Sequence, residues 1–225
     1  MQENLSMTAQ PFFRPEDYPN QLGLLHLTST DIERQIVSYT LSFPSTRIRE
    51  VEKGIKFPQF VKAFYNFIYK NEKVPTQQEF FDFYLAVNHD HFAAANYSNE
   101  IINGLRARVF RTYPSLVRDF HFNKVLTEKA LGYEIVYNSA LDIEHDIDIL
   151  IVRDGKYWAA CLYTQTTRAN IARDWKVYRH ERFSNVQYIE FPVTLDDKSK
   201  LGDFFLYGDR ELDTLIASIT KEMPS

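Results

Sequence analysis

The chain has 225 residues, of which 44% are hydrophobic, 15% aromatic and 25% charged. The aromatic content excludes a mainly disordered protein, and the single cysteine excludes a disulfide framework. A net charge of −4 gives no global attraction for nucleic acid, so any such contact needs a local basic surface. No apolar run could span a bilayer, and the first residues lack the pattern of a secretory signal. We therefore expect a soluble cytoplasmic protein with no membrane partner.

The first half of the chain falls into two parts. Residues 1–24 contain three prolines among polar and aromatic residues, which predicts an extended N-terminal segment. In residues 25–110, apolar and aromatic side chains recur at three- and four-residue spacing, which is typical of the core-facing side of helices. This part is therefore predicted to be all-helical.

Two capping patterns mark helix starts within this region. Ser29 or Thr30 can cap the first helix, with Glu33 three residues after Thr30. Thr76 and Glu79 have the spacing of a capping box and open a later helix.

The pattern changes in residues 111–225. An amphipathic helix follows Pro114 and ends near Gly132, and strands and helices then alternate, which favours a mixed sheet flanked by helices. The predicted strands are Tyr133–Tyr137, Ile147–Val152, Tyr157–Tyr163 and Val186–Val193, and the predicted helices are Asn170–Phe183 and Asp209–Lys221.

Acidic residues gather around the start of the second predicted strand. Asp146 and Asp148 lie two residues apart, which puts their side chains on one face of a strand. Mg²⁺ is commonly held by one or two carboxylates, with water and substrate phosphate as the other ligands. If the turn at Arg153–Lys156 pairs this strand with the next, the polar residues from Thr164 to Arg168 lie beside the aspartates. The pattern predicts a divalent-cation site at this end of the sheet.

At these residues the chain resembles the PD-(D/E)xK nuclease superfamily, the fold of restriction endonucleases and Holliday-junction resolvases. The resemblance covers roughly Arg111–Lys221 and rests on the order of elements, on the strand that starts at Asp148, and on Gln165. It implies a restriction-endonuclease-like α/β core in which Asp148 and Gln165 bind Mg²⁺ or Mn²⁺. It also implies DNA as the partner. A homodimer is a further arrangement that we consider.

The resemblance assigns two further acidic roles. In that family an acidic residue on the first core helix often assists; here this is Asp119 or Glu128, and the distance to Gly132 favours Asp119. Asp146 or Asp142 would be an auxiliary metal ligand.

The family also has a lysine two residues after the Glu or Gln, where this chain has Thr167. The resemblance therefore implies that Arg168 or Lys176 stabilises charge on the phosphate. Arginine does not serve as a base in this role, because its guanidinium is not deprotonated in proteins.

Basic residues concentrate in two places, as expected for a local nucleic-acid surface on an acidic protein. The first comprises Arg168, just before the predicted helix Asn170–Phe183, and Arg173, Lys176 and Arg179 within that helix. A second basic stretch comprises Arg106, Arg108, Arg111 and Arg118.

Three functions remain open from the sequence. The first is a Mg²⁺-dependent DNA endonuclease, supported by the carboxylates and the basic helix. The second is an inactive nuclease homologue that holds nucleic acid or a protein, favoured by the absent motif lysine. The third is a helical adaptor joined to a structural α/β domain.

Overall fold

The structure is a computed structural model that describes residues 11–164 and 182–221. It divides into two compact units, and each is built from separate stretches of the chain. The first unit consists of Met1–Asn20 and Gly132–Thr194, and the second of Gln21–Leu131 and Leu195–Ser225. The boundary expected between residues 110 and 111 falls inside a helix of the second unit.

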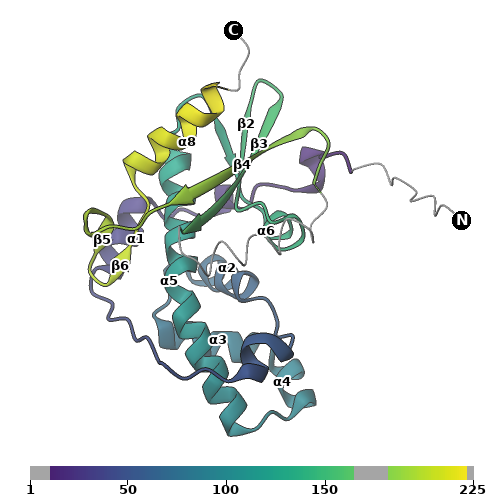
Figure 1. Cartoon of the computed structure of the whole chain (residues 1–225), viewed down its shortest axis with the longest axis vertical. Coiled ribbons are helices and arrows are strands. Elements are labelled where there is room, and N and C mark those ends of the chain that lie inside the picture. Colours follow the sequence, from purple (N-terminus) through teal and green to yellow (C-terminus); the bar gives the residue numbers. More distant parts are fainter. Residues whose placement is uncertain (1–10, 165–181, 222–225) are drawn as a thin grey trace, which may run out of the picture. The chain divides into compact units, whose positions relative to one another are not determined.

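The first unit is built on a mixed sheet of four strands in the order β1-β2-β3-β4. Figure 1 labels β2, β3 and β4 of this sheet. Neighbouring strands are antiparallel from β1 to β3, and β4 runs parallel to β3. The strands are β1 (Glu134–Val136), β2 (Ile149–Arg153), β3 (Lys156–Thr164) and β4 (Val186–Val193). The four predicted strands and the β2–β3 turn are therefore confirmed, with ends shifted by up to two residues, and the protein has a mixed α/β fold.

Apolar side chains cover both faces of the sheet. Trp158, Ala159 and Ala160 of β3 are fully buried although successive residues point to opposite faces, as expected for a strand buried on both sides. On the face that carries Ala159, the sheet packs against Phe13 from the N-terminal segment and Leu141 from the β1–β2 connection. The N-terminal segment, which includes the short helix η1 (Pro15–Asp17), is thus part of this core.

The connection between β1 and β2 contains a short helix, α6 (Ser139–His145), that the sequence patterns did not predict. Asn138 caps it through a hydrogen bond to the amide of Ala140, and the helix ends at Asp146, which has a left-handed backbone conformation (φ 56°). Asp146 is therefore outside β2, which starts at Ile149. Asp146 and Asp148 do not share a strand face as predicted, because the chain turns between them.

The second unit is mainly helical, as predicted for residues 25–110. Its elements are η2 (Leu22–Leu24), α1 (Ser29–Ile36), η3 (Glu50–Gly54, a π-helix), α2 (Phe60–Asn71), α3 (Gln77–Val87), α4 (His89–Ala95), α5 (Asn99–Lys129), η4 (Asp197–Ser199), the β5–β6 hairpin (Lys200–Leu201 and Phe204–Phe205) and α8 (Asp209–Lys221). Aromatic rings from α2, α3 and α5 form its core, in which Phe64 contacts Phe80, Tyr113 and Phe120.

The two predicted caps have different outcomes. Thr76 and Glu79 form the expected capping box at the start of α3. At α1 the predicted cap is wrong, since Thr28 caps the helix together with Asp31. The hydroxyl of Ser29 instead donates a hydrogen bond to Glu128, so Ser29 does not cap the helix.

Helix α5 runs through Pro114, where the sequence predicted a new helix to begin. Proline lacks the amide that would bond the carbonyl four residues earlier, here that of Phe110. The side chain of Gln77 supplies a substitute donor, with its Nε2 at 2.9 Å from the Phe110 oxygen. Although α5 has 31 residues, neither it nor any other helix in the described part of the chain has the length and apolar character to span a membrane.

Candidate functional site

Three polar side chains lie in one row across the sheet of the first unit. Cys161 on β3 is in register with Glu190 on β4. The pairing of Ile149 with Ala160 puts Asp148 opposite Cys161 on the other side, just before β2 starts. Asp148, Cys161 and Glu190, which we call the carboxylate row, belong to the same sheet face as Ala159.

The Asp148 carboxylate is fixed against β3. Its Oδ2 accepts the backbone N–H of Leu162 at 2.7 Å, so the side chain takes the place of a backbone carbonyl just where the β2–β3 ladder ends. A half-buried carboxylate needs such a partner, because burial of an unpaired charge is costly. The bond holds Asp148 beside Cys161 and Leu162 of β3, whereas the sequence pattern placed the aspartates beside residues 164–168.

Glu190 is the second carboxylate of the row. Its Oε1 lies 3.0 Å from the guanidinium of Arg182, which also lies over the ring of Tyr188, 4.6 Å from its centre. The sequence patterns did not single out Glu190, since one acidic residue in an alternating strand is usually a solvent-facing position. Its place in the row depends on the parallel pairing of β4 with β3, which joins residues far apart in the sequence.

Cys161 lies between these two carboxylates. Its Sγ–H donates to the backbone oxygen of Asp146 at 3.2 Å. Burial raises the pKa of the thiol well above its usual range, and the negative charges of Asp148, Glu190 and Asp146 raise the pKa further. The side chain is therefore a neutral thiol, which suits neither a nucleophile nor a metal ligand.

The other acidic candidates lie elsewhere. Asp142 is on α6, where its Oδ2 accepts from the hydroxyl of Tyr137 at 3.2 Å. Asp119 is on α5 in the second unit, with its Oδ1 at 3.7 Å from Nε of Arg118. Glu128, the alternative to Asp119, accepts both the amide and the hydroxyl of Ser29. Glu128 therefore has a structural role, and the catalytic role of Asp119 stays a prediction.

Several predicted site residues lie outside the described residues. They are the metal ligand Gln165, the charge-stabilising residues Arg168 and Lys176, and the predicted nucleic-acid-binding residues Arg173 and Arg179. The predicted helix Asn170–Phe183 lies outside as well, except for Arg182 and Phe183, which are not helical.

The second basic stretch has internal partners in the second unit. Arg108 donates to the backbone oxygen of Val51, and Arg111 bonds the Glu52 carboxylate and nearby backbone oxygens. Arg106 and Arg118 lie over the rings of Phe81 and Tyr207. The expectation of a nucleic-acid surface at this stretch is therefore not supported, because these arginines hold the unit together.

The carboxylate row offers two carboxylates, the kind of oxygen donor that hard cations prefer. In residues 11–164 and 182–221 no group of three or more Asp, Glu, His and Cys side chains could hold a metal ion. Zinc sites need three or four such ligands, whereas Mg²⁺ commonly uses one or two carboxylates and takes its other oxygens from water and phosphate. Asp148 and Glu190 are oxygen donors of that kind, and Glu190 is also paired with Arg182.

Comparison with protein-family models, with curated proteins and with solved structures finds no match to this chain.

Proposed function

We propose that this protein is a metal-dependent DNA endonuclease of restriction-endonuclease-like fold. The observation that carries the proposal is the hydrogen bond from the Leu162 amide to Asp148, which fixes a carboxylate beside β3 two residues before the strand ends at Thr164. In the chain, Gln165, the second ligand that the resemblance implies, follows three residues after Leu162. The order of a long helix, three antiparallel strands and a fourth strand parallel to the third also supports the proposal.

The proposal gives roles to the metal ligands and to the basic residues that contact the phosphate. A divalent ion, when bound, would polarise a phosphodiester oxygen and lower the pKa of a water for in-line attack. Asp148 and Gln165 hold the ion in the proposal, and Glu190 binds it directly or through water. Arg168 or Lys176 contacts the phosphate and stabilises its developing negative charge.

The test is cleavage of supercoiled plasmid DNA in Mg²⁺ or Mn²⁺ by the full chain and by Asp148→Asn. Asparagine keeps an oxygen that can accept the Leu162 amide, so the variant removes the charge while the strand end keeps its partner. We expect cleavage to fall by about 100-fold or more, on the scale of losing one group that stabilises transition-state charge.

The matched control is Asp154→Asn, which makes the same chemical change in the β2–β3 turn, where the residue has a left-handed backbone that asparagine also adopts. It should cut DNA at the wild-type rate. Equal cleavage by Asp148→Asn and wild type would contradict the proposal, as would a wild-type chain that cuts no DNA with either metal. Salt-dependent DNA binding without cleavage would instead indicate the inactive homologue.

A further inference from the structure

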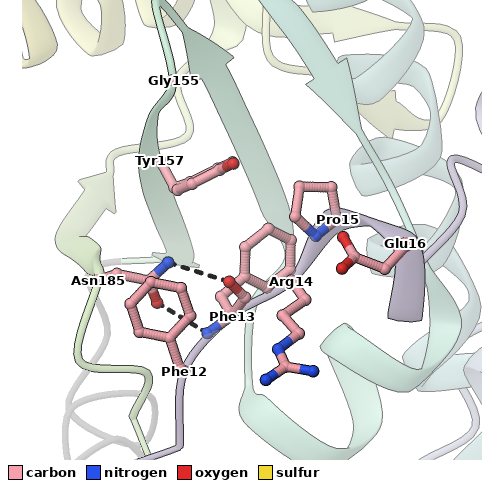
Figure 2. Close-up of a pocket in the computed structure, with 8 residues that line it drawn as sticks. All are labelled: Phe12, Phe13, Arg14, Pro15, Glu16, Gly155, Tyr157 and Asn185. Atoms are coloured by element: carbon pink, nitrogen blue, oxygen red, sulfur yellow. Dashed lines mark hydrogen bonds between the residues drawn. The ribbon is translucent and has the colours of Figure 1, made fainter.

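The N-terminal segment of the first unit borders a pocket of about 480 Å³, next to the turn between β2 and β3 (Figure 2). This volume is within the range of sites for small ligands. Its side chains include Phe12, Arg14 and Glu16 from the segment, Tyr157 from β3, and Asn185 from the turn before β4. Aromatic, cationic and acceptor groups are thus gathered in one place.

The backbone of the segment is held firmly. Asn185 accepts the amide of Phe13 at 2.7 Å and donates to its carbonyl at 3.0 Å, as Figure 2 shows, and the Ser184 amide donates to the carbonyl of Pro11 at 2.9 Å. The Phe13 ring is buried and contacts the rings of Tyr18 and Tyr157. The residues on either side of Phe13 are therefore presented in a fixed position.

The side chains of those two residues, Phe12 and Arg14, do not pack in the core. In an extended segment, side chains two residues apart lie on the same side, at roughly 7 Å spacing. Because Phe13 points into the core, Phe12 and Arg14 point outward, and Phe12 is 64% exposed. Among the described residues, no ion pair engages Arg14. A rigid backbone that keeps an aromatic ring and a guanidinium exposed side by side is suited to a ligand with a flat ring and a negative charge.

We propose that this pocket binds one nucleotide of a single-stranded nucleic acid, with the base stacked on Phe12 and the phosphate paired with Arg14. The carboxylate of Glu16, which also lines the pocket, repels phosphate and accepts a hydrogen bond from an exocyclic amine of the base. Cytosine carries such an amine and thymine does not, so oligodeoxycytidine binds better than oligodeoxythymidine.

The pocket and the carboxylate row lie at opposite ends of the same sheet face. From Tyr157 to Cys161 the strand advances four residues, or about 13 Å. This inference rests on the proposed function for its choice of nucleic acid as the ligand.

The experiment measures fluorescence anisotropy of labelled oligodeoxycytidine and oligodeoxythymidine, each of about ten nucleotides, over a salt series with EDTA present to prevent cleavage. We expect Phe12→Ala to weaken binding between about 5-fold and 100-fold, and Phe12→Trp to retain it because tryptophan also stacks. Arg14→Ala should reduce the slope of log affinity against log salt by about 0.7, the value for one phosphate contact in a single strand.

The matched controls are Phe43→Ala, which removes a ring of similar exposure (61%) in the second unit, and Arg34→Ala, which removes an exposed arginine paired with Asp31. Both should bind as the wild type does. Equal affinities of Phe12→Ala and Phe43→Ala would overturn the inference, and so would a wild-type chain that binds neither oligonucleotide at about 100 µM.

The two proposals fail separately. If Asp148→Asn abolishes cleavage while Phe12→Ala binds normally, the nuclease remains and the pocket assignment is wrong. If Phe12→Ala loses binding in a chain that cuts no DNA, the pocket assignment stands without the nuclease.

Discussion

The residues of the carboxylate row differ in how far their contacts could be predicted from the sequence. It was predictable that Asp148 has a hydrogen-bonding partner, because a carboxylate directly before a run of buried strand residues is costly to bury unpaired. The partner itself, the Leu162 amide, follows from the β2–β3 register. Glu190 could not be predicted, since only the parallel pairing of β4 brings it beside Cys161.

Cys161 gives a test of this environment. Because burial and the neighbouring carboxylates raise the pKa of the thiol above its usual range, almost no thiolate is present at about pH 8. We expect iodoacetamide to react with the folded protein far more slowly than with the protein in guanidinium chloride. The rate should still rise with pH well above pH 8.5 rather than level off there.

The readout comes from one site, because the chain has a single cysteine. Equal alkylation rates for the folded and unfolded chain would show that Cys161 is exposed and reactive. The geometry of the carboxylate row would then be wrong.

At the scale of elements, the four strands and the closing helix α8 (Asp209–Lys221) were predictable, whereas α6 and the continuity of α5 were not. A strand such as β3 is a continuous apolar run bounded by an Asp-Gly turn, so local sequence is sufficient. The short helix α6 has seven residues, three of them charged or histidine, and offers no apolar periodicity to detect. The continuity of α5 through Pro114 depends on Gln77, which no local pattern links to the proline.

The link between Gln77 and Pro114 can be tested by mutation. Gln77 is buried, and besides bonding Phe110 its amide accepts from the amide of Ser42 and donates to the Ser42 carbonyl. Gln77→Ala leaves these buried groups unpaired, so we expect the free energy of unfolding to fall by about 2–3 kcal/mol. Chemical denaturation measures the change.

A second variant tests whether Gln77 compensates for the amide that Pro114 lacks. In Pro114→Ala, the new amide can donate to the Phe110 carbonyl, so Gln77→Ala should cost less in that background than in the wild type. The control is the exposed neighbour Gln78→Ala, which we expect to change stability by less than about 0.5 kcal/mol. An equal cost of Gln77→Ala in both backgrounds would contradict the compensation.

On the scale of the whole molecule, both units combine distant stretches of the chain. The second unit is completed by Leu195–Ser225, where Phe204 of β6 contacts the ring of Tyr113 on α5 at 6.0 Å. The first unit takes in the N-terminal segment through Phe13. Composition and periodicity describe neighbours in sequence. They therefore predicted the mixed α/β class and the helical region, but not that each unit combines two separate stretches of the chain.

Net charge also bears on function at this scale. At −4 the chain repels nucleic acid overall, and the described arginines of the second basic stretch are used internally. The DNA binding that we propose would therefore have to come from local groups such as Arg14 and from divalent ions at the carboxylates. Such binding weakens as salt rises.

The central claim is that Asp148 holds a divalent ion, and a crystal structure with bound Mn²⁺ tests it most directly. The account predicts an anomalous peak at about 2.1–2.2 Å from a carboxylate oxygen of Asp148 and no such peak in Asp148→Asn. A peak that persists in the variant, or a wild-type crystal at saturating Mn²⁺ with no metal beside Asp148, would contradict it.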